Sequence, residues 1–329
     1  MKSNQIIIIA FIFLILSGLL TGCFSGYFRD KSDQSDNYSD NTGDLTVTSD
    51  NSFETDEVTQ KETTSSQNVS VSTGTGLGPD SGYEENNTGS HIAQKFAVIA
   101  SGSSYDSQHY AWFLNSTDMA YELLKNNGYT DENIYYLFEN SKESNVDFQS
   151  TIGNFKIVTD KLQEKADKTD TIVLFLIGHG SYDGTNSYYT LSGYNLADTE
   201  MAAMFKNIKR DKLIFVFSPC NSGGFVDDLS RKNTVVITST RKDETNSAAF
   251  IEPLLLSFSG AGDSDLNGKV SFAEAFNYAS INVRDQYINN SWGTLTEHAQ
   301  IDDNGDDISN EAPVPAGGDG LLAGEIYLK

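Results

Sequence analysis

Two apolar runs of strand length constrain the fold of this chain more than any other feature. They span residues 172–177 and 213–217, and both are rich in β-branched and aromatic residues. Continuous apolar runs that stop abruptly at glycine or proline are typical of strands buried on both faces of a parallel sheet. A helical stretch, 195–209, lies between them and is long enough for a crossover connection. The two runs therefore predict neighbouring parallel strands.

The remaining pattern extends this prediction to an α/β fold. Strands alternate with helices along the chain, which favours a three-layer α/β/α sandwich with a mainly parallel sheet. A polar, hairpin-like stretch interrupts the alternation at 188–191. The predicted strands are 96–100, 134–138, 172–177, 213–217, 235–238 and a short one near 325–328, and the predicted helices are 113–126, 152–166, 196–208, 248–258 and 272–285.

Each of the two apolar runs is followed by a residue that can act in catalysis. His179 comes after the first run and Cys220 after the second, and glycines stand close to both. Because parallel strands end at the same edge of a sheet, we expect the two side chains to meet there, where open α/β sheets place their sites. A buried cysteine or a strand-end histidine is usually structural when taken alone. The combination instead predicts a Cys220/His179 dyad, with the thiolate as nucleophile and the imidazole as acid and base.

The N-terminal residues predict export. Lys2 precedes an apolar run, 6–20, that is too short for a comfortable membrane span but suits the core of a signal peptide. The run ends in a segment, 20–23, that resembles a bacterial lipoprotein cleavage box, in which Cys23 would be lipidated; an uncleaved anchor is the alternative. The chain has two cysteines. Lipidation of Cys23 would leave Cys220 as the one thiol of an exported protein, which suggests a reactive role.

The predicted organisation has three parts: a signal peptide (1–23), an acidic, Ser/Thr-rich tether (24–90) and a globular domain (91–329). The tether has no hydrophobic period and cannot bury enough apolar surface to offset its ordering entropy. A pro-segment that masks the site is the rival interpretation, but the stretch contains no apolar docking patch. The formal net charge of −24 argues against a nucleic-acid partner. We expect a cell-surface, membrane-anchored lipoprotein.

The segment around the dyad resembles the legumain family of the caspase-like cysteine peptidases, which includes a transamidase subunit. The resemblance rests on Gly178-His179-Gly180-Ser181 after one apolar strand and Cys220 after the next, and it extends over about 96–258. It implies a caspase-like fold and hydrolysis of peptide bonds in protein or peptide substrates, with no organic cofactor. It also implies that the backbone N–H groups of Cys220 and Gly180 stabilise the oxyanion.

The substrate pocket matches the family less well. Legumains have an acidic residue two positions before the cysteine, where this chain has Ser218, and an ungapped match puts Trp112 at the position of their pocket arginine. A preference for Asn or Asp therefore does not carry over. Ser239 and Thr240 match the family's substrate-binding segment in place, and we expect them, with Ser218, to border the pocket. Arg241 could supply a pocket charge or be solvated.

Two other functions stay open. A transamidase would use the same dyad to pass the acyl group to an amine instead of water, and no sequence feature separates it from a hydrolase. A catalytically inactive, calcium-binding surface module is the third interpretation. Such a module would have no need to keep both His179 and Cys220.

A twelve-residue segment, 263–274, matches the EF-hand calcium loop. Oxygen donors fall at positions one, three, five, nine and twelve, glycine at six, and position seven contributes its backbone carbonyl. We therefore expect a structural Ca²⁺ that fixes the following helix. The predicted ligands are Asp263, Asp265, Asn267, Lys269, Ser271 and Glu274. A second oxygen-rich run, Asp302, Asn304 and Asp306, lacks glycine and glutamate in register and favours a solvated loop over a second ion site.

Overall fold

The computed structural model describes residues 92–245, 249–291 and 293–329. The expected signal peptide, Cys23 and the tether lie outside these residues, so all three stay predictions. Among the described residues, no helix is both long and apolar enough to cross a membrane.

An eight-stranded sheet forms the centre of the domain, in the order β11-β10-β9-β8-β4-β1-β2-β3. The pairings from β3 across to β9 are all parallel, and only β10 and β11 pair antiparallel with their neighbours. The strands are β1 (Lys95–Ser101), β2 (Ile134–Phe138), β3 (Phe148–Gln149), β4 (Thr171–Ile177), β8 (Lys212–Phe217), β9 (Thr234–Thr238), β10 (Gln300–Asp302) and β11 (Asn310–Glu311). The mainly parallel sheet predicted from the apolar runs is confirmed.

The central strands are buried on both faces, as their continuous apolar sequences predict. In β1, Phe96, Val98 and Ala100 belong to one hydrophobic core, while Ala97 and Ile99 belong to the other. This alternation follows from the two-residue period of a strand. Each face of the sheet therefore needs its own covering of helices.

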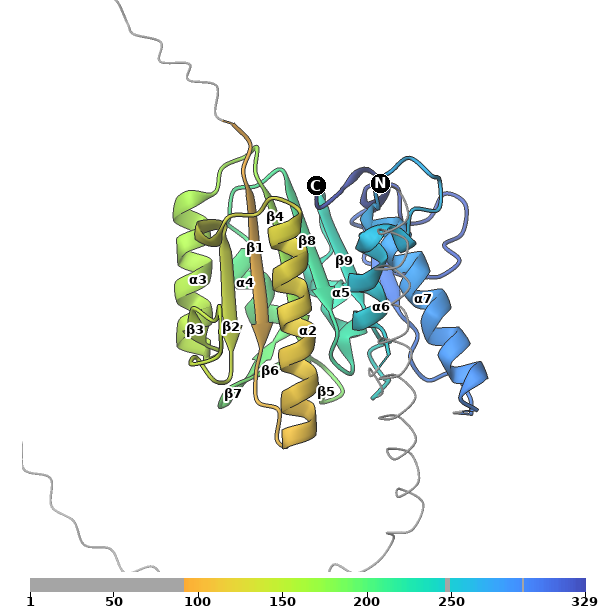
Figure 1. Ribbon diagram of the computed structural model, residues 1–329, viewed down its shortest axis with the longest axis horizontal. Helices are drawn as coiled ribbons and strands as arrows, with labels where there is room; N and C mark the ends of the chain where they lie inside the picture. The colour runs from red at the N-terminus through yellow and green to blue at the C-terminus, as the bar shows by residue number, and fades with distance from the viewer. Residues whose placement is uncertain (1–91, 246–248, 292) are drawn as a thin grey trace, which may run out of the picture. The chain divides into compact units, whose positions relative to one another are not determined.

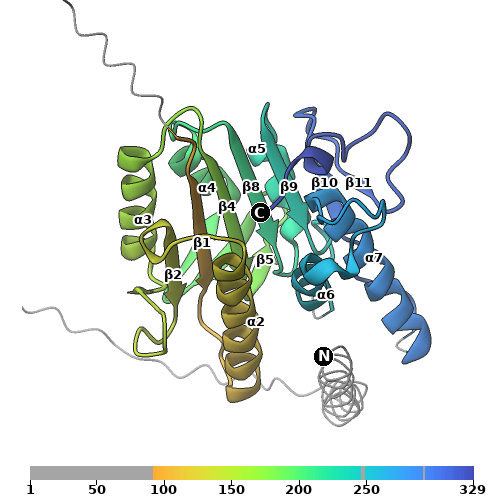
Figure 2. The ribbon, with the colours of Figure 1, turned by 45° about the horizontal axis from the view of Figure 1, so that its top comes forward.

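Two sets of helices cover the sheet, as Figures 1 and 2 show. Helices α2, α6 and α7 contribute the buried side chains of one core, and α3, α4 and α5 those of the other. Their bounds are α2 (Ser107–Asn126), α3 (Ile152–Lys165), α4 (Asp198–Phe205), α5 (Phe225–Leu229), α6 (Ile251–Leu256) and α7 (Phe272–Asn289). The predicted three-layer α/β class is confirmed.

A second, three-stranded sheet follows directly after His179. Its strands are β5 (Gly180–Tyr182), β6 (Ser187–Leu191) and β7 (Tyr194–Ala197), and both pairings are antiparallel. The hydroxyl of Tyr189 in β6 donates to the carbonyls of Ala100 and Ile177, at 2.6 and 3.0 Å. These carbonyls belong to the ends of β1 and β4, so the small sheet is fastened to the carboxyl edge of the large one.

Several helices differ from their predicted bounds. The helix predicted at 196–208 is α4, which begins later because residues 196 and 197 belong to β7 and which ends at Phe205. Helix α7 continues to Asn289, beyond the predicted end at 285. Helix α2 begins at Ser107 and not at residue 113, because the Asp106 side chain caps it by accepting from the backbone N–H groups of Gln108 and His109. The helix predicted at 248–258 is α6, which continues as a π-helical segment, Ser257–Ala261, in which Gly260 has a φ of 106°.

The last predicted strand, near residues 325–328, does not form. A single turn of 3₁₀-helix, Ala323–Glu325, occupies its beginning. One isolated antiparallel bridge, between Ser271 and Tyr327, is the part of the expected pairing that is present. The C-terminal segment thus docks beside the start of α7 and adds no strand to the sheet.

Candidate active site

Strand register brings His179 and Cys220 to neighbouring positions. Strands β4 and β8 are parallel, with Leu176 opposite Phe217. The N–H of Ser218 donates to the carbonyl of Leu176 at 2.8 Å, which extends the pairing past the end of β8. His179 and Cys220 are each the third residue beyond the Leu176–Phe217 pair. The register therefore brings both residues to the same carboxyl edge, on strands that lie roughly 4.8 Å apart.

Gly180 contacts the backbone of the loop that follows β8 and contains Cys220, which we call the cysteine loop. A Cβ at this position would lie 2.3 Å from the carbonyl oxygen of Cys220 and 2.8 Å from the Cβ of Pro219. Real Cβ atoms do not approach backbone oxygen so closely, and only glycine fits here. The two backbone segments expected to form the oxyanion hole therefore lie in contact. The oxyanion role of Cys220 and Gly180 itself stays a prediction.

The His179 ring is held by a backbone carbonyl and by aromatic neighbours. Its Nε2 lies 3.2 Å from the carbonyl oxygen of Ser104. The ring stacks on Tyr105 with centroids 4.8 Å apart and meets Phe113 edge-on at 5.0 Å. Because a carbonyl only accepts, Nε2 carries the hydrogen and Nδ1 keeps its lone pair. The neutral ring thus has Nδ1 as its base.

Glu139, at the end of β2, fixes Ser104 in turn. Its two carboxylate oxygens accept from the backbone N–H and the hydroxyl of Ser104, at 2.8 and 2.7 Å. Ser104 is therefore a third member of the site that acts through its carbonyl. Sequence reasoning could not find it, since a backbone carbonyl is present at every residue and leaves no residue-type signal.

The surroundings of His179 favour its neutral form. Burial lowers the pKa of His179 most, the Ser104 carbonyl opposes this, and a positive charge on His109 would lower the pKa further. His109 lies in the first turn of α2, with its ring centroid 4.9 Å from that of His179 and its Nδ1 2.6 Å from an Asp106 oxygen. A neutral imidazole is the form that can accept a thiol proton.

The pKa of His179 is open to a direct test. NMR titration of the Cys220→Ala chain should give His179 a pKa below the ordinary value, because that variant removes coupling to the thiol. His109→Gln in the same background should raise the pKa of His179, since a like charge is removed while the burial, Asp106 and Glu139 remain. An unchanged or lower value would show that His109 does not lower the pKa of His179.

Hydrogen bonds from two neighbouring segments fix the cysteine loop. Asn221 takes a left-handed conformation, with a φ of 59°, and its N–H donates to the carbonyl of Glu244 at 2.7 Å. The hydroxyl of Ser187 in β6 donates to the Asn221 carbonyl at 2.7 Å. The half-buried thiol of Cys220 donates to the carbonyl of Thr245 at 2.8 Å. Proton transfer to His179 therefore requires the S–H to leave Thr245.

Ser218, Ser239 and Thr240 lie directly beneath this loop, and all three are buried. The Ser239 hydroxyl donates to the carbonyls of Ser218 and Pro219, at 2.9 and 3.2 Å. The Thr240 hydroxyl accepts from the N–H of Ser222 at 3.1 Å. The hydroxyls of Ser239 and Thr240 therefore fix the cysteine loop by hydrogen bonds. Their expected contact with substrate stays a prediction.

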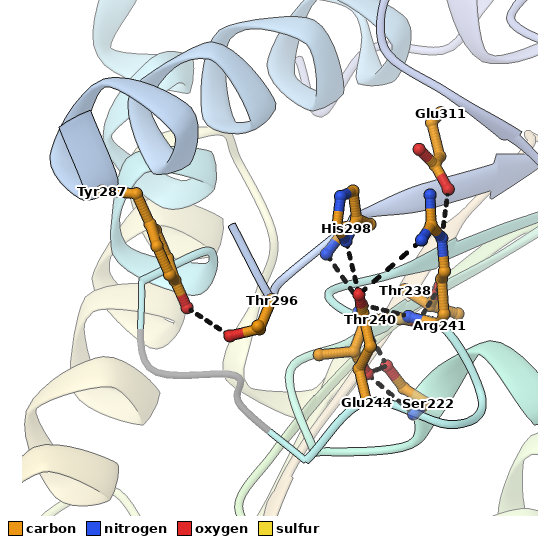
Figure 3. A network of polar contacts seen from close by, with 9 residues as sticks. All are labelled: Ser222, Thr238, Thr240, Arg241, Glu244, Tyr287, Thr296, His298 and Glu311. Carbon is orange, nitrogen blue, oxygen red and sulfur yellow. Dashed lines mark hydrogen bonds and ion pairs between the residues drawn. The ribbon is translucent and has the colours of Figure 1, made fainter. Parts of the chain in front are cut away.

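Arg241 belongs to a charged network (Figure 3). Its Nε donates to Glu311 at 2.5 Å, and its N–H donates to a Glu244 oxygen at 3.0 Å. Glu244 also accepts from the backbone N–H of His298 at 2.9 Å, and its other oxygen is hydrogen-bonded to Nδ1 of the His298 ring. His298 thus orients Glu244, whose backbone carbonyl accepts from the N–H of Asn221. His298 and Glu311 also line a pocket of about 470 Å³.

The predicted calcium loop brings its acidic residues together. Carboxylate oxygens of Asp263, Asp265 and Glu274 lie within 4.8 Å of one another. Asp263 accepts from the backbone N–H groups of Asn267 and Gly268, at 3.0 and 2.9 Å, so the loop curls around its first ligand. Gly268, at position six, has a φ of 82°, as the sharp turn requires. These residues fit a hard divalent cation.

The loop is also joined to the helix that follows it. Glu274 closes a capping box with Ser271 at the start of α7, and its other carboxylate oxygen accepts from the N–H and hydroxyl of Ser264, both at 3.0 Å. The Asn267 side chain accepts from the Lys269 N–H at 2.9 Å. An ion held here would therefore anchor α7.

Comparison with known proteins finds a peptidase family model that matches the central part of this chain. Residues 146–301 match the model of the Peptidase C13 family, and this segment contains both His179 and Cys220. The match supports a cysteine-type peptidase with protein or peptide substrates. No curated protein matches the chain significantly.

Two solved structures are similar at low identity. Protein GSU0716 from Geobacter sulfurreducens is 13% identical, with a TM-score of 0.42 over 70% of this chain and 98% of that chain. The Drosophila initiator caspase Dronc is 10% identical, with a TM-score of 0.42 over 66% of this chain and 81% of that chain. At these values neither structure informs on the activity of this chain.

Proposed function

We propose that this protein is a cysteine endopeptidase in which Cys220 is the nucleophile and His179 the general base and acid. One observation carries the proposal: within the segment that matches the Peptidase C13 family, His179 and Cys220 each follow the carboxyl end of one of two paired parallel strands, β4 and β8. The Ser104 contact at Nε2 supports it further, because it leaves Nδ1 available to the thiol.

The reaction follows from these positions. Nδ1 of His179 takes the proton of Cys220 Sγ, and the sulfur attacks the peptide carbonyl carbon. The oxygen of that carbonyl becomes negative and is stabilised by the N–H groups of Cys220 and Gly180. His179 then gives its proton to the leaving amine, the C–N bond breaks and a thioester forms. Water, activated by His179, hydrolyses the thioester to a carboxylate and restores the thiol.

The test is cleavage of a diverse peptide library by the full chain before and after alkylation with iodoacetamide. We expect cleavage that stops when Cys220 is alkylated, and the products define the residue preferred before the scissile bond. An added amine distinguishes hydrolysis from transamidation, since a transamidase gives an amide product. A folded protein whose thiol resists alkylation and which cleaves nothing would favour the inactive binding module.

We also propose that the 263–274 loop holds Ca²⁺ as a structural ion. Asp263, Asp265, Asn267, Ser271 and Glu274 would supply side-chain oxygens, and Lys269 its carbonyl. The ion would add positive charge where carboxylates converge and would fix α7 to the domain. For the expected surface lipoprotein, millimolar affinity is sufficient to fill such a site.

Glu274→Gln should remove this ion. We expect equilibrium dialysis to show one Ca²⁺ fewer per chain than in the wild type. At roughly 100 times the dissociation constant, binding stabilises the folded state by about 2.7 kcal/mol, which the variant should lose. Glu164→Gln, an exposed change in α3, is the matched control and should keep the full calcium response. An unchanged stoichiometry in Glu274→Gln would refute the loop site.

A further inference from the structure

Three carboxylates lie buried at the end of β10, outside the predicted calcium loop. Asp302, Asp303 and Asp319 are 0%, 4% and 5% exposed. Asp302 was expected in a solvated run together with Asn304 and Asp306. Those two residues are exposed, but Asp302 is not, and this part of the prediction is wrong because Asp302 is the last residue of β10 and pairs with Val236 of β9.

Both carboxylate oxygens of Asp303 accept hydrogen bonds. One of its oxygens accepts from the N–H of Gly320 at 2.9 Å and the other from the N–H of Ala323 at 2.7 Å. Its own N–H donates to one oxygen of Asp319 at 3.1 Å. Asp303 thus fixes the C-terminal segment. The same bond places the Asp319 carboxylate against the peptide that joins Asp302 to Asp303.

The carboxylates of Asp302 and Asp319 are hydrogen-bonded less completely. One oxygen of Asp302 and one of Asp319 are buried and have no hydrogen-bond partner among the described residues. The second oxygen of Asp302 accepts a long hydrogen bond, 3.3 Å, from the N–H of Gly305. Burial raises the pKa of Asp302, and the nearby Ser230 hydroxyl partly opposes this by hydrogen bonding. No ion pair of the described residues joins either carboxylate to a lysine or arginine.

An arrangement of this kind is unfavourable unless a proton or a cation compensates the negative charge. Burying an ionised carboxylate without compensation is strongly unfavourable, and two that share one site repel each other. Asp302 is one of the charges that add to the effect of burial on Asp319, whose pKa is raised to about 6. A pocket of about 250 Å³ has Asp319 in its lining, beside Gly317, Gly318 and Gly320. An ion and its water ligands can therefore approach this carboxylate.

We propose that Asp302 and Asp319 bind a second hard divalent cation, of the Ca²⁺ class, through their unpartnered oxygens. Carboxylate oxygens are the ligands such ions prefer, and water and backbone carbonyls complete the coordination. The ion would join the end of β10 to the segment before the last 3₁₀ turn. Because Ala273 and Phe276 of α7 line the same pocket, this ion and the one in the loop would hold the same helix from two sides.

The test is calcium binding by the full chain in the Glu274→Gln background, where the loop site is removed. We expect isothermal titration to find one remaining Ca²⁺, and Glu274→Gln/Asp319→Asn to lose it or to bind at least tenfold more weakly. Asp285→Asn, an exposed carboxylate change in α7, is the charge control and should retain the ion. Absence of calcium binding in folded Glu274→Gln would overturn the proposal.

A second measurement covers the case in which the Asp319 variant does not fold. The melting temperature of Glu274→Gln alone is compared in Ca²⁺, in Mg²⁺ and in chelator at pH 7.5 and pH 5. The proposal predicts a Ca²⁺-dependent rise that shrinks at pH 5, because protons then compete for the carboxylates. If protons alone neutralise Asp302 and Asp319, the melting temperature does not change with Ca²⁺ at either pH. That result would refute the second cation site.

Discussion

Cys220→Ala is expected to lower kcat/KM for peptide cleavage by on the order of 10⁴- to 10⁶-fold, which is the cost of removing a catalytic nucleophile. Stability should change little. The half-buried side chain gives up one hydrogen bond to the Thr245 carbonyl, which contributes about 1 kcal/mol. Steady-state cleavage of the best library peptide measures the first effect, and the melting temperature measures the second.

His179→Gln is the companion variant. The glutamine amide can still donate toward the Ser104 carbonyl, but it cannot take the thiol proton, so a comparable loss is expected. If both residues act in one step, the double variant Cys220→Ala/His179→Gln should be scarcely less active than either single variant. If the two single-variant losses in kcat/KM multiply in the double variant, this pair is not the catalytic unit. Substantial cleavage by Cys220→Ala would show the same.

Gly180→Ala is expected to lower kcat/KM by about 10²-fold or more, although it adds only a methyl group. The new Cβ would lie 2.3 Å from the Cys220 carbonyl oxygen. The Cys220 loop or β5 must therefore shift, which displaces one or both expected oxyanion donors, and small misplacements of catalytic groups cost about this much. The overpacking should also reduce the free energy of unfolding by about 1–3 kcal/mol.

Gly153→Ala provides the matched control for this substitution. Its Cβ would meet only the Thr151 hydroxyl, at 3.9 Å, and it lies in helix α3. Alanine should leave cleavage unchanged there and raise stability by about 0.5–1 kcal/mol. The important comparison is kcat/KM of Gly180→Ala at a temperature where it is fully folded. Wild-type activity there would mean that the contact does not position the oxyanion donors.

Much of the fold could be predicted from local sequence, because burial on both faces leaves a direct signature. The continuous apolar runs gave β4 and β8 nearly residue by residue, and with them the positions of His179 and Cys220. The turn chemistry of the 263–274 loop is similarly local, since glycine at position six and the carboxylates around it are set by spacing. Helix α2 was missed at its start because a polar first turn, capped by Asp106, resembles a loop.

The features that depend on distant segments were not predictable. The Ser104 carbonyl that orients His179, and the Glu139 side chain that holds Ser104, come from the ends of other strands. Ser239 and Thr240 were expected to border the substrate pocket, which stays a prediction, and only the structure shows that their hydroxyls bond to the cysteine loop. Such roles arise only when folding brings distant segments together. A backbone carbonyl leaves no signal in the residue type, and a hydroxyl forms hydrogen bonds with whichever groups pack against it.

By itself, the sequence determined the strand pattern, the chemistry at the strand ends and the calcium-loop spacing, since each follows from residues close together in the chain. Only the tertiary structure decided the surroundings of those residues. It set the tautomer of His179 and buried Asp302 and Asp319 with one carboxylate oxygen of each lacking a hydrogen-bond partner among the described residues. The physical reason is that burial, pairing and charge compensation depend on neighbours in space, and strand order and packing bring those neighbours from far along the chain.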